Sequence, residues 1–249
     1  MEYRDYIWWA NITSAVFMCI GLIGTTILLM NVDAIETFTL APPYGDNMRV
    51  LRPVMASDSV GIHPAAIIAA YFGITAVEHV VNIFRADQLN AAIIDKYVWT
   101  RWLSYSVTAP IMMVTLGAIS GVIDAYTLVL IGFLTFLCIL CGWADDYVRD
   151  NSTIGDRTIG RVFNILGFLA LIFAHVPIWG SYNTYSSVAP AFVTGLVAVM
   201  TLLMFSFGFV RVVFRDRPYP QELAFYFLSL TSKQILGWVI ATGIAARTD

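Results

Sequence analysis

The stretch LAFYFLSLTSKQILGWVIATGI, residues 223–244, is an apolar run with one charged side chain, Lys233. A membrane-spanning helix needs about 20 mostly apolar residues, so this run is long enough to cross a bilayer. With about 1.5 Å of rise per residue from a start near residue 221, the amine of Lys233 lies roughly 18 Å into the span, near mid-bilayer. A charge at that depth is costly and is a candidate functional group by default.

The whole chain has the composition of an integral membrane protein. Of its 249 residues, 59% are hydrophobic and 12% are charged, whereas soluble domains carry about 25% charged residues. The formal net charge of -3 gives no basic surface for nucleic acid, so no nucleic-acid partner is expected. We expect a multi-pass protein of the cell membrane that contacts lipid.

Apolar segments long enough to span a membrane recur along the chain and predict an all-α bundle of seven transmembrane helices, with residues 1–249 forming a single domain. The long connection at 31–63 is rich in Pro and Gly and is predicted to fold as a cap, for which a β-hairpin is one form. The predicted spans are 7–30, 64–86, 97–119, 122–143, 159–180, 187–212 and 221–246.

The distribution of Arg and Lys predicts the orientation of the bundle. Ten of these residues fall on the side of the N-terminus and three on the other side. Cytoplasmic loops carry an excess of positive charge. The N-terminus is therefore predicted to be cytoplasmic and the C-terminus extracellular, with 31–63 as a long first extracellular loop.

Polar residues follow helical spacing in two of the predicted spans and should face the interior of the bundle. Counted from the cytoplasmic ends, Glu78, His79, Ser104 and Ser229 lie at similar depths of roughly 10–12 Å, just to the cytoplasmic side of Lys233. The two stripes are Thr75, Glu78, His79 and Asn82, and Thr100, Ser104 and Thr108.

Each of these polar groups has both a structural and a functional interpretation. Lys233 either pairs with a buried acid or forms a Schiff base with a carbonyl ligand. Ser229, one turn earlier on the same face, either bonds that amine or bonds back to its own helix. Glu78 and His79 either form a local ion pair or belong to the site. His175, near the outer end of its span, is expected to be a satisfied core histidine.

Several motifs in the chain resemble those of the heliorhodopsin family, seven-helix retinal proteins of inverted topology. The likeness extends over nearly the whole chain. The motifs are RWLSYSVTAPIMMV (101–114), GVIDAYTLVLIGF (121–133), GWADDY (142–147), VAPAFVTG (188–195) and LSLTSK (228–233).

This resemblance implies that Lys233 carries all-trans retinal as a protonated Schiff base and that Ser229 contacts it. Light would then isomerise the pigment to the 13-cis form. Asp146 aligns with a cytoplasmic family carboxylate, with a solvated surface charge as the alternative. The resemblance also implies a homodimer and a photoreceptor rather than an enzyme, and it identifies no cytoplasmic partner. The predicted retinal contacts are Thr108, Met112, Ile139, Gly142, Met204, Phe205 and Trp238, with Ser104 near the Schiff base.

Three positions depart from the family pattern. The helix that begins near residue 97 has Ser104 where the family has its counterion glutamate. Met18 occupies the place of a first-helix histidine. The second-span histidine is retained as His79, but Glu78 precedes it where the family commonly has an apolar residue.

The exchange at Ser104 leaves three hypotheses for the charge balance of the Schiff base. At an effective dielectric of 20, an opposite charge about 4 Å away stabilises the protonated Schiff base by about 4 kcal/mol, and loss of the counterion glutamate removes that stabilisation. Either Glu78 replaces the missing anion, or a chloride binds near Ser104, Thr108 and Ser229, or the Schiff base is neutral.

The function predicted from these observations is light sensing, in which the Schiff-base proton moves toward Glu78 and His79 and a signalling change follows. His79 suits this role because an imidazole changes its charge near neutral pH. Net ion pumping is not expected, because the outer halves of the third and seventh spans are largely apolar. A light-driven proton or anion transporter or channel is the first alternative. A chromophore-free seven-helix scaffold or receptor is the second.

Overall fold

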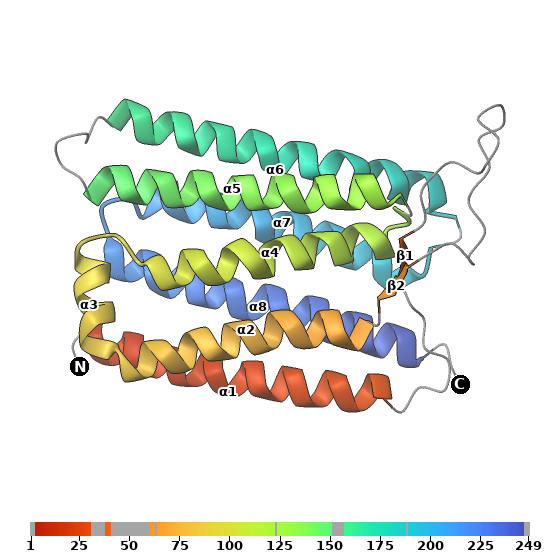
Figure 1. The fold of residues 1–249 in the computed structure, drawn as a ribbon, viewed down its shortest axis with the longest axis horizontal. Coiled ribbons are helices and arrows are strands. Elements are labelled where there is room, and N and C mark those ends of the chain that lie inside the picture. The colour runs from red at the N-terminus through yellow and green to blue at the C-terminus, as the bar shows by residue number, and fades with distance from the viewer. Residues whose placement is uncertain are drawn as a thin grey trace.

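The computed structural model describes most of the chain as a bundle of helices (Figure 1). Its helices are α1 Tyr3–Met30, α2 Pro64–Phe84, α3 Ala86–Ile94, α4 Trp99–Ile119, α5 Ala125–Asp150, α6 Arg157–Tyr185, α7 Ala191–Val213 and α8 Pro218–Ala245. The described residues are 3–30, 38–40, 60–62, 64–122, 124–150, 157–187 and 189–246.

The prediction of seven membrane spans is confirmed, because seven of these helices, all except α3, are long and apolar enough to cross a bilayer. The chain is therefore a multi-pass membrane protein. The N- and C-termini lie at opposite ends of the bundle (Figure 1), as an odd number of spans requires. Which end faces the cytoplasm stays a prediction from the positions of Arg and Lys.

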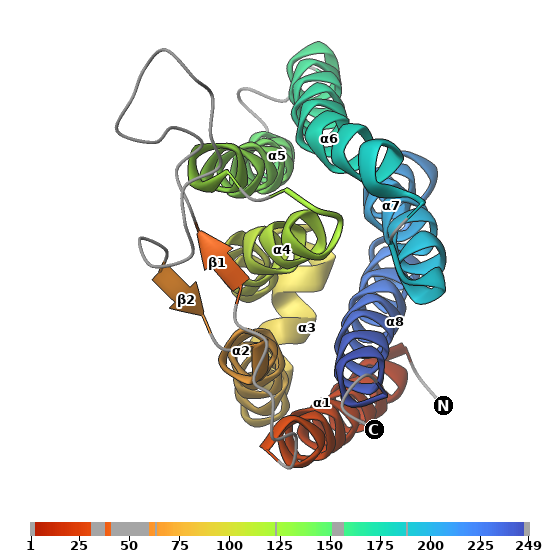
Figure 2. The same cartoon turned by 90° about the vertical axis from the view of Figure 1, so that its right-hand side faces the viewer.

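The spanning helices form a closed ring, seen end-on in Figure 2. Around the ring, α1 packs on α2, α2 on α4, α4 on α5, α5 on α6, α6 on α7, α7 on α8, and α8 returns to α1. The short helix α3 lies at the N-terminal end of the bundle and contacts α2 and α8. This ring places the interior faces of all seven spans around one central region.

Two elements differ from the sequence prediction. The helix α3 was not predicted, because its nine residues are too short to span a membrane. The helix α5 continues to Asp150 although the predicted span ended at residue 143. It continues because Asp145 and Asp146, charges that would normally end an apolar span, are paired with arginines of neighbouring helices.

Most of the predicted cap at 31–63 lies outside the described residues. Within it, strands β1 (Phe38–Leu40) and β2 (Val60–Ile62) pair antiparallel, with Phe38 opposite Ile62. This pairing agrees with the hairpin that was considered for the loop.

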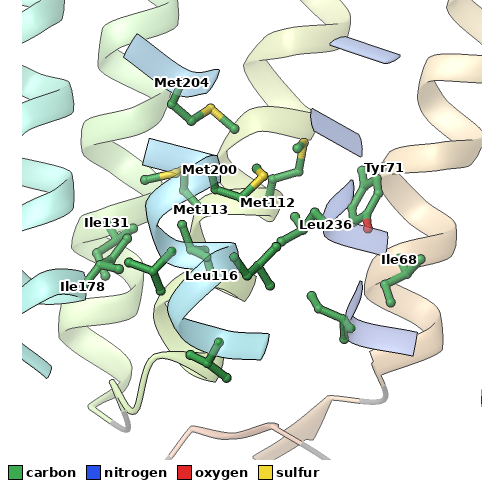
Figure 3. Packing of buried hydrophobic residues seen from close by; sticks show 14 of the residues in the cluster. Ile68, Tyr71, Met112, Met113, Leu116, Ile131, Ile178, Met200, Met204 and Leu236 are labelled. Carbon is green, nitrogen blue, oxygen red and sulfur yellow. The ribbon is translucent and has the colours of Figure 1, made fainter. Parts of the chain in front are cut away.

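The interior of the bundle is polar toward the N-terminal end and apolar toward the C-terminal end. The apolar half is filled by Met, Leu and Ile side chains, among them Met112, Met113, Leu116, Met200 and Leu236 (Figure 3). Its buried hydroxyls, on Thr25, Thr115, Ser120 and Thr135, donate to carbonyls of their own helices. The buried charged residues that the structure describes, by contrast, all lie at mid-bundle or toward the N-terminal end.

Gly237 permits the close approach of α8 and α2 beside Lys233. A Cβ atom at Gly237 would lie 2.5 Å from the ring of Phe72 and 2.9 Å from the hydroxyl of Tyr71. Both rings are fully buried, so neither has free space into which it can move. Gly73, in the middle of α2, has no atom within 4 Å of the equivalent position.

We therefore predict that Gly237→Ala destabilises the protein by about 1–3 kcal/mol through overpacking. The matched control, Gly73→Ala, should be neutral or stabilising by about 0.5–1 kcal/mol, since Ala favours a helix over Gly. Thermal unfolding of the purified protein in detergent measures both. Equal midpoints for the two variants would contradict the packing described for Gly237.

Candidate functional site

Lys233 lies in the middle of α8 and is buried, with 3% of its surface exposed. Its Nζ donates a hydrogen bond to Ser229 Oγ at 2.8 Å, one helical turn away. The ammonium also lies 5.1 Å from the centroid of the Tyr105 ring on α4, within range of a cation–π contact. The predicted contact between Ser229 and the amine is thus present.

Glu78 on α2 is the carboxylate that interacts electrostatically with Lys233. The two side chains do not form a direct ion pair, and Glu78 Oε2 has no hydrogen-bond partner among the described residues. The Ser104 hydroxyl lies beside this carboxyl group and interacts with it. The structure therefore brings together Lys233, Glu78, Ser104 and Ser229, contributed by three different helices.

His79 faces the same interior and is held by α1 and α8. Its Nδ1 lies 2.9 Å from Asn11 Oδ1, and its ring packs edge-on against Tyr226 with centroids 5.2 Å apart. Together with Thr75, Glu78 and Asn82 it forms the predicted interior stripe, and all four residues are buried. Asn11 and Tyr226 were not predicted, although Tyr226 lies on the same face of α8 as Glu222, Ser229 and Lys233, and this spacing could have identified it.

A cluster of buried ion pairs lies between this group and the N-terminal end of the bundle. Arg101 on α4 pairs with Glu222 on α8 and, at 2.8 Å, with Asp146 on α5. Arg211 on α7 pairs with Asp145 and, at 3.2 Å, with Asp146. The cluster joins four helices, and burial of Asp146 excludes the interpretation as a solvated surface charge.

Trp102 holds the two guanidinium groups of this cluster in place. Its ring centroid lies 4.8 Å from Arg101 Cζ and 5.0 Å from Arg211 Cζ. Its indole N–H donates to Asp146 at 2.7 Å. One side chain therefore satisfies a carboxylate and provides an aromatic face for both arginines.

A cavity opens beside Lys233. Aromatic and aliphatic side chains of α4, α5, α6, α7 and α8 form most of its wall. The amine of Lys233 belongs to this wall. An elongated apolar aldehyde fits such a site, because the amine can condense with its carbonyl group and the apolar wall can pack against its body. The predicted contacts that line the cavity are Lys233, Thr108, Met112, Ile139, Gly142 and Met204.

Two other predicted contacts lie outside this cavity. Trp238 donates its indole N–H to Gln234 at 2.8 Å, and its ring packs toward Gly24 of α1. Phe205 is half-buried, stacks on Phe168 with centroids 6.2 Å apart, and lies next to His175. Their role as retinal contacts stays a prediction from the resemblance.

Sequence reasoning missed the wall contributed by α6. Phe163, Gly167 and Leu171 follow one another at intervals of four residues and all line the cavity. This spacing marks one face of a helix, but it is also the spacing of ordinary core residues. His175, one turn further along, is buried and its Nδ1 contacts the Leu171 carbonyl at 2.8 Å. Its Nε2 has no hydrogen-bond partner among the described residues, so the expectation of a satisfied core histidine is met for one nitrogen only.

The family model described as Heliorhodopsin matches residues 7–245 of the chain. A comparison with curated protein sequences finds no match. The match to the family model therefore covers all seven spans and the whole of the site.

Solved structures with a similar fold are microbial rhodopsins. Exiguobacterium sibiricum rhodopsin has a TM-score of 0.74 at 15% identity, over 99% of this chain and 98% of that chain. Xanthorhodopsin, a light-driven ion pump with dual chromophore, has a TM-score of 0.71 at 12% identity, over 99% and 94%. The proton-pumping rhodopsin AR2 from the marine alga Acetabularia acetabulum has 0.66 at 13% identity, over 100% and 96%. At these identities the likeness shows the fold alone.

We predict that Arg101→Gln destabilises the protein by about 3–5 kcal/mol, because it removes the cation that Glu222 and Asp146 share inside the bundle. The exposed ion pair of Arg4 with Asp87 provides the control. Arg4→Gln should cost about 0–1 kcal/mol, since water screens exposed pairs. Unfolding in detergent compares the two. A similar small loss for both variants would contradict a structural role for the buried cluster.

Proposed function

Because the chain belongs to the heliorhodopsin family of light-sensing retinal proteins, we propose that it signals in response to light without net ion transport. The observation that carries this proposal is Lys233, a buried amine in the wall of an apolar cavity at mid-bundle. Retinal would bind Lys233 covalently through a Schiff base and supply light absorption and a double-bond isomerisation. The roles of the protein's own residues follow from their positions.

The one-sided distribution of polar groups supports sensing over transport. Toward the N-terminal end, Glu78, His79, Asn11, Tyr226 and the ion-pair cluster supply hydrogen-bonding groups. Toward the C-terminal end, the interior beyond Lys233 is filled by apolar side chains such as Leu236, Ile240 and Leu116. A transporter requires an ion route on both sides of the site, and hydrocarbon packing opposes such a route on one side.

Glu78 is the proposed counterion of the charged nitrogen on Lys233. It is the carboxylate that interacts electrostatically with that nitrogen, and Ser104, which replaces the family glutamate, lies beside it. The negative charge would thus have moved from α4 to α2, and the hydroxyl of Ser104 would occupy the α4 position that carries the charge in the family. Glu78 does not contact the Lys233 nitrogen directly. The immediate hydrogen-bond partner of that nitrogen is Ser229.

After light displaces the proton from the Lys233 nitrogen, the proposed acceptors are Glu78 and His79. Loss of the positive charge at Lys233 would change the field on the nearby ion-pair cluster, which joins α4, α5, α7 and α8. In this proposal the N-terminal end is cytoplasmic, a homodimer forms, and an unidentified cytoplasmic protein reads the change. The single domain proposed for 1–249 would act as one unit.

We predict that the expressed protein forms a coloured pigment when all-trans retinal is added, and that Lys233→Ala abolishes it. Borohydride reduction followed by peptide mapping should place the label on Lys233. Light should produce no steady current under voltage clamp. Absence of any pigment would support a chromophore-free scaffold or receptor, and a sustained photocurrent would support a transporter or channel.

A second prediction concerns the counterion. Glu78→Gln should move the absorption band from the visible to the near ultraviolet, because the charged nitrogen loses the stabilisation of a nearby negative charge, which is at most about 4 kcal/mol at an effective dielectric of 20. Adding Ser104→Glu to this variant should restore the visible band. Ser104→Ala in the wild-type background provides the control and should keep the band in the visible.

Halide titration separates the remaining hypotheses for the counterion. If Glu78 balances the charge, exchanging chloride for sulfate leaves the wild-type band in place. A band that moves with chloride and is unaffected by Glu78→Gln would assign the role to a bound chloride. A wild-type band in the near ultraviolet at all halide concentrations would mean a neutral Schiff base.

A further inference from the structure

The side-chain amide of Asn11 is held in one orientation inside the bundle. Its Nδ2 donates to the Ile7 carbonyl at 2.9 Å and to the Tyr226 hydroxyl at 3.3 Å. A backbone carbonyl can only accept a hydrogen bond, so the NH2 group of the amide must lie on that side. The amide oxygen consequently faces His79, whose Nδ1 is 2.9 Å away.

This orientation determines which nitrogen of His79 carries the proton. Because the amide oxygen can only accept, Nδ1 must donate and therefore bears the hydrogen. In a neutral imidazole the other nitrogen, Nε2, is then a bare acceptor. Nε2 is buried and has no hydrogen-bond partner among the residues that the structure describes. The opposite tautomer would set two lone pairs against each other at Nδ1 and Oδ1.

The surroundings of His79 leave Nε2 as the ring atom available to a proton. The Tyr226 ring packs edge-on at an interplanar angle of 77° and restrains the imidazole plane. The charged groups nearby are Lys233, which interacts electrostatically with the ring, and the adjacent Glu78. Glu78 Oε2 likewise has no hydrogen-bond partner among the described residues, and Ser104 lies beside that carboxyl group, so polar atoms able to pass a proton lie in the same interior.

We propose that Asn11 is a positioning residue that holds His79 as the Nδ1–H tautomer and thereby presents Nε2 as the acceptor of the light-displaced proton. The inference rests on the proposed function for the origin of that proton. In the transfer, the N–H bond at the Lys233 nitrogen breaks and an Nε2–H bond forms. The Nδ1–H bond to Asn11 is kept, so the ring becomes a cation whose second proton stays hydrogen-bonded to the amide oxygen.

The first experiment uses the pigment-free protein in the dark. The chain has three histidines, so a ¹⁵N-histidine NMR spectrum is simple, and the signals that disappear in His79→Gln identify His79. Wild type should give the Nδ1–H tautomer. Asn11→Leu should yield a mixture or the Nε2–H form, whereas Asn11→Asp, whose carboxylate also accepts from Nδ1, should keep Nδ1 protonated.

Tyr226→Phe provides the matched control, because it removes one acceptor of the Asn11 amide and leaves the Ile7 carbonyl in place. It should retain the wild-type tautomer. An Nε2–H tautomer in wild type, an unchanged tautomer in Asn11→Leu, or a Tyr226→Phe effect as large as that of Asn11→Leu would each overturn the proposal. None of these results depends on retinal or light, so they are independent of the proposed function.

The second experiment follows the proton by infrared difference spectroscopy of the retinal-loaded protein. Illumination should produce bands of a protonated imidazole that are absent in His79→Gln. These bands should decrease at least severalfold in Asn11→Leu and be rescued in Asn11→Asp. Normal bands in Asn11→Leu would show that Asn11 does not position the acceptor. Absence of the bands in wild type, with the dark tautomer as expected, would instead refute His79 as the acceptor.

Discussion

The cost of keeping the Lys233 ammonium away from water is the constraint around which the rest of the interior is arranged. An isolated charge in a low-dielectric medium is strongly unfavourable unless hydrogen bonds and opposite charge compensate it. Ser229 accepts from the amine, the Tyr105 ring lies within cation–π range, and the Glu78 carboxyl group interacts electrostatically with the amine across the interior. These contributions come from α8, α4 and α2, so the amine can be stabilised only when the helical ring has closed.

The same constraint explains why the polar interior lies on one side of the amine. Each buried polar group requires a partner, and groups that satisfy one another must be clustered. Asn11 links His79 to Tyr226, and further along Arg101 links Glu222 to Asp146. In the other half of the bundle, the buried hydroxyls of Thr25, Thr115, Ser120 and Thr135 bond to carbonyls of their own helices instead. Lys233 lies at the boundary, where a change in its charge acts on the polar half.

In the proposal for Glu78, the site would keep its electrostatic balance although Ser104 carries no charge. The α4 position that holds a glutamate in the family has a hydroxyl here, and a carboxylate on α2 lies beside it. Electrostatic compensation depends on distance and dielectric rather than on which helix carries the charge. The proposal for Glu78 applies this principle to one site and is open to the complementation test described above.

Hydropathy and helical periodicity are local properties of the chain, so the sequence alone was enough to predict the seven spans, the interior placement of the α2 stripe, the central lysine and the serine one turn away. The motifs of α4, α5 and α8 also determined the family. The folded structure was needed to show that Asp145 and Asp146 are buried rather than solvated and that Asn11 reaches His79. It also shows that the Trp238 ring packs toward Gly24 of α1. These outcomes depend on which faces of distant helices meet when the ring closes, and the spacing of residues within one helix does not specify that.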